Sequence, residues 1–241
     1  VSLLGNKLAF VLNTLPADDF PKLPIPHREQ VIELNLLDFS TAIRQVSFAA
    51  ASDSAKTILT GVNLQVQDGL LKMAATDGYR LAVRSLVLGN EVQPVNVIIP
   101  KRTLVELEKL IKQDGQDSLL MSVAENHVVF ESQDKLLTSR LIEGKYPDYN
   151  KILPRIFERK VWVETRPFLA AVERVAIMAS EQTHVVTFEV HPQSMVISAG
   201  AEQGQAREEI DIKNEGEPLS ISFNSQYLIE VLRIYAEDTS H

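Results

Sequence analysis

The sequence predicts an α+β protein made of repeated units, in each of which two helices pack on antiparallel sheets. Apolar and polar side chains alternate over residues 62–67, which is typical of a half-buried strand. Apolar residues at helical spacing in residues 39–50 and 104–111 indicate amphipathic helices. Short segments also recur in the same chain order about 125 residues apart. Tight turns join most of the strands, which favours antiparallel pairing.

Residues 31–141 contain the elements of one complete unit. The first helix is predicted to begin after Asp38 or Ser40, either of which can serve as N-cap, and the second helix follows Pro100. Tight turns are predicted at residues 67–69, 76–78, 125–126 and 133–134. The eight predicted strands cover residues 31–35, 62–67, 70–75, 80–88, 96–99, 119–124, 128–132 and 135–141.

Length and composition exclude several classes of protein. The chain has 241 residues, is 45% hydrophobic and 23% charged, and so has an ordinary globular composition with room for about two domains. No apolar run approaches the ~18 residues of a membrane helix, and no basic-then-apolar leader is visible after Val1. Zero cysteines exclude disulfides and thiolate chemistry. The net charge of −8 argues against a generally basic surface but allows one basic face.

The recurring segments predict the domain organisation. Leu15, Phe20 and Pro21 recur as Leu141, Tyr146 and Pro147. Two further matches pair residues 51–53 with 179–181 and residues 104–107 with 228–231. We therefore expect residues 1–26 to be the remnant of a first domain, 27–154 a complete second domain with its linker, and 155–241 a partial third domain. The whole protein is expected to hold about three units of about 125 residues. Chance resemblance between apolar strands is the alternative.

A search for catalytic and metal-binding motifs yields none. The five histidines fit no metalloprotease helix pattern, and no carboxylate cluster has the spacing of metal ligands. The glycines form no phosphate-binding loop, since Gly200 and Gly204 lack the following Lys-Ser/Thr pair. We therefore predict no cofactor and no metal. An α+β enzyme that assembles carboxylates such as Asp77 or Asp148 from distant positions stays open as the alternative.

Two stretches allow both a structural and a functional interpretation. Residues 75–82, with Asp77-Gly78 at the centre, fit a hairpin turn. Tyr79 and Arg80 at the end of that turn are also a residue pair that can hold a partner peptide. Residues 144–154 fit a stiff proline-containing linker. The same residues could form an apolar, aromatic wall at a domain junction, where ligands often bind.

Residues 76–81 (Thr-Asp-Gly-Tyr-Arg-Leu) and 144–149 (Gly-Lys-Tyr-Pro-Asp-Tyr) resemble the signature segments of the bacterial DNA polymerase III beta subunit family, the sliding clamps. Residues 14–21 and 223–227 resemble the same family, so the resemblance spans nearly the whole chain in order. It implies clamp-type domains and a head-to-tail homodimer of three-domain subunits that forms a ring around duplex DNA without reading its sequence. It also implies a cytoplasmic, non-catalytic processivity factor that binds no membrane.

The resemblance also implies a binding site for short peptide motifs of polymerases and the clamp loader, in a crevice between the second and third domains. Apolar walls there would bury hydrophobic side chains of the peptide, at roughly 1.5–3 kcal/mol for each one. Arg80, Lys151 and Asn224 would satisfy its polar or C-terminal groups. The positions that match the family's site are Leu59, Thr76, Gly78, Tyr79, Arg80, Leu81, Pro147, Lys151, Ile152, Asn224 and Tyr227.

Charge on the predicted helices bears on contact with DNA. Residues 38–51, 101–112, 166–180 and 225–236 are less acidic than the rest of the chain and together carry a small positive charge. A weakly positive lining suits sliding, because phosphate contacts add affinity without fixing a register. Solvated helix faces give the same pattern. The residues expected to face DNA are Arg44, Lys101, Arg102 and Arg174.

Four apolar residues match the family's subunit contact. Phe10 and Leu12 correspond to the edge strand of the first domain, and Ile177 and Met178 to a helix end in the third. Plain core packing is the alternative for all four.

Overall fold

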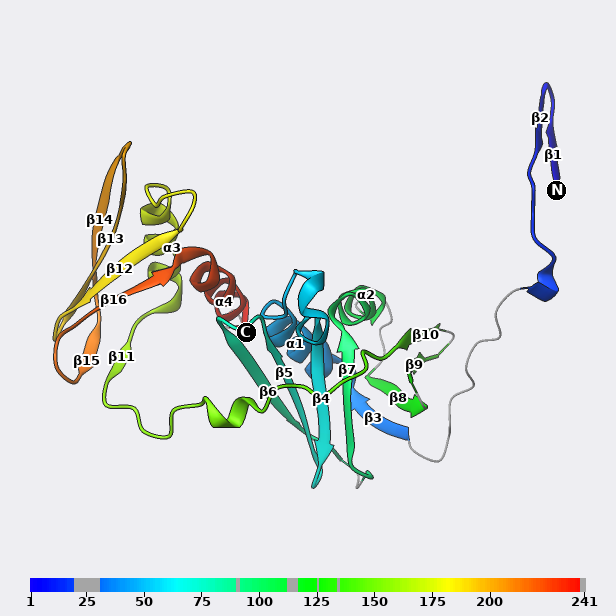
Figure 1. Cartoon of the computed structure of the whole chain (residues 1–241), viewed down its shortest axis with the longest axis horizontal. Helices are drawn as coiled ribbons and strands as arrows, with labels where there is room; N and C mark the ends of the chain where they lie inside the picture. Colours follow the sequence, from blue (N-terminus) through cyan, green and yellow to red (C-terminus); the bar gives the residue numbers. More distant parts are fainter. Residues whose placement is uncertain (20–30, 90–91, 112–116, 125, 134, 239–241) are drawn as a thin grey trace.

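The elements of the chain are shown in Figure 1, a computed structural model that describes residues 1–19, 31–89, 92–111, 117–124, 126–133 and 135–238. The helices are η1 (Ala17–Asp19), α1 (Leu36–Ser47), η2 (Ser54–Thr60), α2 (Lys101–Ile111), η3 (Tyr149–Lys151), α3 (Thr165–Ala176) and α4 (Ser225–Asp238). The strands are β1 (Ser2–Gly5), β2 (Leu8–Val11), β3 (Val31–Asn35), β4 (Gly61–Gln67), β5 (Leu70–Thr76), β6 (Leu81–Val87), β7 (Val95–Pro100), β8 (Ser118–Ala124), β9 (His127–Ser132), β10 (Lys135–Arg140), β11 (Lys160–Trp162), β12 (Val185–Val190), β13 (Ser194–Ala201), β14 (Gly204–Asp211), β15 (Lys213–Glu215) and β16 (Leu219–Asn224).

All of the paired strands in the described part of the chain are antiparallel, which confirms the α+β class. One four-stranded sheet has the order β6-β5-β4-β7, and a second has the order β14-β13-β12-β16. These two orders follow the same pattern. Three consecutive strands pair as neighbours, and a later strand pairs with the first of the three. A third sheet, β10-β9-β8-β3, belongs to the same part of the chain as β6-β5-β4-β7. We call residues 31–141 the first segment and residues 160–238 the second segment. The hairpin β1-β2 and the pair β11-β15 complete the topology.

Each segment has its own core, built where a helix covers the equivalent sheet. Helix α1 packs on β5 and β6, and α3 packs on β13 and β14. Phe39, Ile43 and Val46 lie one helical turn apart and are fully buried, so the apolar face of α1 is the face that contacts the sheet. Phe168 and Val172 occupy the same place on α3. The apolar faces of α1 and α3 therefore form the two cores together with the sheets that these helices cover.

The four α-helices lie in one row. Helix α4 contacts both α3 and α1, and α1 contacts α2, so the row runs α3, α4, α1, α2 across both segments. Figure 1 shows this order, with the sheet β14-β13-β12-β16 beyond α3 and the sheet β6-β5-β4-β7 below α1. None of the helices in the described part of the chain is both long and apolar enough to cross a bilayer.

Several element boundaries differ from the sequence predictions. Helix α1 begins at Leu36, and its N-cap is Asn35, whose side chain accepts a hydrogen bond from the backbone N–H of Asp38 at 3.0 Å. The prediction of Asp38 or Ser40 was wrong because Leu36 and Leu37 resemble a continuation of the strand. The 3-10 helix η2 was not predicted. Asp68 and Gly69 both have positive φ, which confirms the turn at 67–69.

Some predictions fall partly on residues outside those described. Residues 125 and 134 are in this group, and each belongs to one of the predicted tight turns. Phe20 and Pro21, which carry one of the repeat matches, also lie outside the described residues. The shared sheet order of the two segments rests on other residues and does not depend on these positions.

Replacing Gly61 by alanine is expected to lower the free energy of unfolding by about 1–3 kcal/mol. Gly61 begins β4 opposite Pro100, and a Cβ there would lie 2.5 Å from Ile98 Cγ2 and 3.0 Å from the Ile99 carbonyl. The sheet would have to shift to admit the methyl group. Chemical denaturation measures the effect, with Gly89→Ala as the control because open space surrounds that glycine. Equal stability of the two variants would contradict the close approach.

Candidate functional site

The turn between β5 and β6 is held rigid by its own side chains. Asp77 Oδ1 accepts hydrogen bonds from the backbone N–H groups of Tyr79 (2.9 Å) and Arg80 (3.1 Å). Thr76 Oγ1 accepts from the N–H of Gly78 (3.0 Å) and donates to the Arg80 carbonyl (2.6 Å). Gly78 has φ +97°, a conformation that favours glycine. The backbone that carries Tyr79 and Arg80 therefore has one well-defined path.

Burial alone would raise the pKa of Asp77, but the hydrogen bonds from Tyr79 and Arg80 and the charge of Arg80 outweigh it. The pKa of Asp77 therefore lies below its ordinary value of 3.8. A lowered folded-state pKa means that the carboxylate stabilises the fold at neutral pH. That contribution is lost as the pH falls through the lowered value, so acid weakens this turn. Asp77 thus acts as a structural group of the turn.

Arg80 connects the two segments of the chain. Its Nε donates to Asp77 Oδ2 (3.0 Å), its Nη1 to Glu230 Oε2 on α4 (2.6 Å) and its Nη2 to the Phe48 carbonyl after α1 (3.1 Å). The Arg80 side chain is 18% exposed. All three nitrogens of the guanidinium are therefore engaged within the chain. The expectation that Arg80 satisfies polar or C-terminal groups of a peptide stays a prediction, which now has to accommodate these three hydrogen bonds within the chain.

Tyr227, in the first turn of α4, contacts two residues of the other segment. The Arg80 guanidinium carbon lies 4.4 Å from the centre of the Tyr227 ring, and the Tyr79 ring stacks at a centroid distance of 6.5 Å and an angle of 27°. Lys56 Nζ lies 5.3 Å from the centre of the Tyr79 ring, and Arg80 also lies over Phe48. We call this set the junction cluster: Phe48, Lys56, Asp77, Tyr79, Arg80, Tyr227 and Glu230.

The linker after β10 packs on the sheet beside this turn. The hydroxyl of Tyr146 accepts a hydrogen bond from the Thr76 N–H at 3.0 Å, and burial raises the pKa of Tyr146 to about 12. Tyr146 and Tyr149 are buried against Ala74 and Ile98. The partly buried residues packed on this cluster are Ile58, Leu59, Leu81 and Ile142. The structure thus brings Leu59, Thr76 and Leu81 together with the linker, as the resemblance implies.

Replacing Tyr146 by phenylalanine is expected to lower the free energy of unfolding by about 1–3 kcal/mol. The change removes only the hydroxyl and leaves the buried Thr76 N–H without its acceptor. Thermal or urea unfolding measures the loss. Tyr79→Phe is the matched control, because Tyr79 is 80% exposed. A loss of the same size in both variants would contradict the structural role of the Tyr146 hydroxyl.

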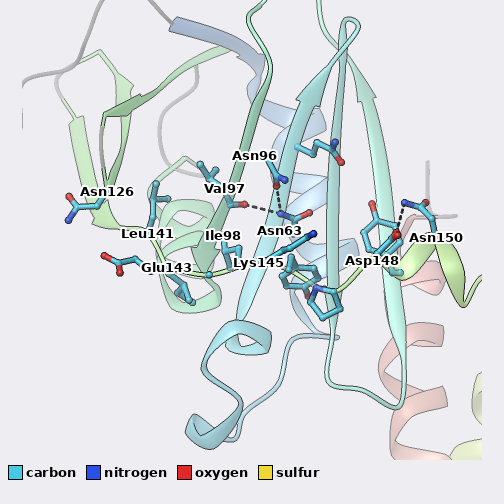
Figure 2. A pocket seen from close by; sticks show the side chains of 16 residues that line it. Asn63, Asn96, Val97, Ile98, Asn126, Leu141, Glu143, Lys145, Asp148 and Asn150 are labelled. Atoms are coloured by element: carbon cyan, nitrogen blue, oxygen red, sulfur yellow. Dashed lines mark hydrogen bonds between the residues drawn. The ribbon is translucent and has the colours of Figure 1, made fainter.

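A polar cavity of about 530 Å³ lies between this linker and the strands β4 and β7 (Figure 2). Asn63 donates through Nδ2 to Asn96 Oδ1 at 2.8 Å, and Asp148 accepts from Asn150 at 3.3 Å. Asp148 also pairs with Lys151 at 3.4 Å. Asp148 lines this cavity, whereas Asp77 belongs to the turn between β5 and β6 and does not line it. The described residues contain no group of acids and histidines that could hold a metal. These observations do not support the alternative of a carboxylate enzyme.

The remaining predicted peptide-site residues have other surroundings. Ile152 is 71% exposed and Pro147 is exposed, so neither is buried in a wall of the site. Lys151 is paired with Asp148. Asn224 accepts a hydrogen bond from the N–H of Gln226 at 2.9 Å and donates to the Thr183 carbonyl, so it caps the start of α4. Its amide is used within its own segment.

The sequence analysis missed three residues of the junction cluster, which are Glu230, Phe48 and Lys56. Tyr146 lies in the linker that it considered as an aromatic wall, but the contact of Tyr146 with the end of β5 is found only in the structure. A signal existed for Glu230, because a residue three positions after Tyr227 lies on the same face of a helix. Nothing in the spacing of Phe48 or Lys56 relates them to Arg80 or Tyr79, because the contacts come from the tertiary fold.

The residues expected to face DNA have different environments. Arg44 lies 3.6 Å from both Glu108 on α2 and Glu237 on α4, and Arg174 makes two hydrogen bonds to Glu208. Lys101 is half-buried, and burial lowers its pKa while Glu230 opposes this effect. Arg102 is exposed at the start of α2. Carboxylates therefore partly offset the positive charge of Arg44 and Arg174.

The observed helix boundaries also change the charge argument. Within the described residues the four α-helices hold seven basic and seven acidic residues, because α4 continues to Asp238 and Lys112 lies outside the described residues. The expected small positive charge is therefore not seen in the described parts of these helices. They are neutral together, which is still less acidic than the chain as a whole at −8.

The four residues matched to the subunit contact are all at least partly exposed. The exposed fractions are 52% for Phe10, 48% for Leu12, 77% for Ile177 and 38% for Met178. Ile177 and Met178 are therefore not packed in the core of their segment. For Phe10 and Leu12 core packing stays the alternative, because every residue of the hairpin strands β1 and β2 is exposed and the rest of the first domain is not part of this chain.

The fold and the site define a class of protein: α+β segments with one repeated sheet order, joined so that their helices form a single row and their junction carries an aromatic cluster. Residues 33–148 match the family model for the DNA polymerase III beta subunit, central domain, and residues 150–239 match that for its C-terminal domain. The chain belongs to the DNA polymerase III beta subunit family.

Individual relatives agree with this assignment. The chain is 34% identical over 230 residues to the beta sliding clamp of Synechococcus elongatus, an alignment that covers 93% of this chain and 61% of that protein. The crystal structure of the DNA polymerase sliding clamp from Bacillus subtilis superposes with a TM-score of 0.89 at 34% identity, over 97% of this chain and 62% of that one. A Pseudomonas aeruginosa sliding clamp bound to griselimycin superposes with a TM-score of 0.87 at 30% identity, over 97% and 63%. The chain therefore spans about three fifths of the length of these relatives.

Proposed function

We propose that this chain is part of a DNA sliding clamp, a ring that encloses duplex DNA and tethers the replicative polymerase to its template. The proposal includes a homodimer of three-domain subunits, a cytoplasmic location and no catalytic activity of its own. Residues 1–26 would be the end of a first domain, 27–154 the second domain with its linker, and 155–241 part of the third. Binding would depend on enclosure and not on base sequence.

The observation that carries this proposal is the continuous row of helices. Two segments with one sheet order place α3, α4, α1 and α2 side by side, so further copies of the segment could extend the same row. A layer of that kind offers DNA a smooth, sequence-independent wall. Its neutral charge supports loose contact, because few phosphates would be neutralised. Of the candidate DNA-facing residues, Arg102 best fits this role because it is exposed and makes no ion pair within the described residues, whereas the exposed Arg174 is bound to Glu208.

We further propose that partner proteins bind at the junction of the two segments through a short peptide with apolar side chains. Leu59, Leu81 and Tyr227 would supply apolar contact, and the rigid turn at 76–81 would hold the site in shape. The four exposed apolar residues Phe10, Leu12, Ile177 and Met178 would form the contact between subunits. Two buried apolar side chains would contribute roughly 3–6 kcal/mol, so polar and backbone contacts would have to supply the rest of the roughly 8 kcal/mol of a micromolar, exchangeable contact.

Primer extension with the full-length protein tests the function. A cognate replicative polymerase and clamp loader should synthesise much longer products per binding event when the protein is present. A trap of excess primed template limits each polymerase to one binding event. The matched control omits the clamp loader, which should return the products to their short length. Products of unchanged length in the complete reaction would contradict the proposed function.

A further inference from the structure

We propose that the polar cavity between the linker and the strands β4 and β7 is a separate binding site, which takes an extended, uncharged peptide segment of a partner protein. None of the residues that line it belongs to the junction cluster, and Pro147 is the only one among the positions matched to the family's peptide site. The inference therefore goes beyond the proposed function. The volume of about 530 Å³ lies in the usual range of ligand pockets, roughly 300–1,000 Å³.

The wall that the linker forms is fixed to the sheet. The Tyr146 hydroxyl accepts a hydrogen bond from the Thr76 N–H at 3.0 Å, and the Ile142 N–H donates to the Ile98 carbonyl at 2.8 Å. Tyr149 is buried in the same apolar cluster as Ile98. The cavity is therefore present before a ligand arrives, which lowers the entropy that binding would cost.

Two carboxamides that line the cavity leave one acceptor and one donor unused. Asn63 is 6% exposed, and its Nδ2 donates to Asn96 Oδ1 at 2.8 Å and to the Val97 carbonyl at 3.2 Å (Figure 2). Among the described residues, none donates to Asn63 Oδ1 and none accepts from Asn96 Nδ2. Since the two side chains are bonded to each other, these atoms lie close together. An acceptor beside a donor matches one peptide group, which offers both an N–H and a C=O.

Strand β7 offers backbone groups to the same ligand. In the described part of the chain it pairs on one side only, with β4, so it is an edge of its sheet. Its residues Asn96, Val97 and Ile98 line the cavity. An edge strand presents unpaired N–H and C=O groups, and extended peptides bind to such edges by adding a strand. This edge favours a peptide over another neutral polar ligand such as a sugar.

The charges around the cavity favour an uncharged segment. Glu143 and Lys145 line it with opposite charges, and the carboxylate of Asp148 is paired with Lys151 at 3.4 Å. A charged peptide would lose hydration there without meeting a net opposite charge. The other lining side chains that can both donate and accept hydrogen bonds through a carboxamide are those of Gln65, Asn126 and Asn150.

The test measures binding of capped pentapeptides made of Gly, Ser, Asn and Gln to the full-length protein, by saturation-transfer NMR at increasing peptide concentration. Peptides of this panel should bind, whereas versions with two Lys or two Glu residues and the neutral disaccharide maltose should not. Asn96→Asp should weaken binding of the panel by at least about tenfold, because it replaces the donor by a carboxylate oxygen and keeps the acceptor for Asn63. Its thermal unfolding should match the wild type, because Asn96 is exposed.

Gln203→Glu is the matched control, since it adds the same charge on an exposed turn of the second segment, and it should bind the panel normally. No binding by any peptide of the panel, equal binding of the charged peptides or maltose, or unchanged binding by Asn96→Asp would overturn the proposal. A polymerase-derived peptide at the junction should bind Asn96→Asp as tightly as the wild type. If that peptide binds the wild type while the panel does not, this site falls and the proposed function stands. Equal loss of both peptides in Asn96→Asp would show a general defect and also overturn the proposal.

Discussion

Phe39→Ala is expected to lower the free energy of unfolding of the segment that contains it by about 3–5 kcal/mol. Phe39 is fully buried on α1, and its ring lies 6.1 Å from that of Phe130 on β9. Alanine would leave a cavity between the helix and both sheets of the segment. The loss is large because the same side chain packs against elements that are far apart in the chain.

Urea unfolding followed by circular dichroism measures this loss. Leu37→Ala is the matched control, since Leu37 neighbours Phe39 on the same helix but is 68% exposed. The control should change the free energy of unfolding by no more than about 0.5 kcal/mol. Similar values for the two variants would show that α1 does not bury the face assigned to it.

Tyr227→Ala is expected to weaken binding of a polymerase-derived peptide by at least about 30-fold, which is the 2 kcal/mol of an interface hot spot. The ring supplies the one large aromatic surface of α4 at the junction cluster, and its loss also removes the stack on Arg80. Tyr227 is partly exposed, so the fold should persist.

Fluorescence anisotropy with the full-length protein measures this effect. Tyr235→Ala, on the same helix and 57% exposed, is the control and should bind normally. Equal weakening by both variants would place the effect in α4 as a whole and contradict a specific site. Arg80→Ala is a poorer test of the site, because it removes three hydrogen bonds, two of them to distant parts of the chain, and should also lower stability.

Much of the fold follows from local pattern. Alternation and helical spacing predict all of the strands β3–β10 and the helix α2 within one or two residues, whereas α1 begins and ends about three residues earlier than predicted. The repeat is visible in the sequence because equivalent positions face equivalent cores, as Phe39 and Phe168 do. Helix η2 was missed because a 3-10 segment with a kink at Lys56 has no apolar periodicity.

The candidate site was predictable only in part. Thr76 to Leu81 form a local turn, so their motif identifies them directly. The contacts of Arg80 within the chain were not predictable, because its partners Phe48 and Glu230 lie 32 and 150 residues away. The charge of the helices was also hard to predict, because it depends on α4 continuing to Asp238, two residues beyond its expected end. Tertiary contacts decide these properties.

The central claim is that copies of this segment enclose the duplex. The most direct test compares the fraction of protein that stays bound to circular DNA with the fraction that stays bound to linear DNA. Labelled full-length protein is loaded onto nicked circular DNA, washed at high salt, and the bound fraction is measured before and after the circle is cut once. Enclosure predicts that the protein stays on the intact circle at a salt concentration that screens phosphate contacts, and is lost when the circle becomes linear. Equal loss from both forms, or equal retention on both, would contradict the account.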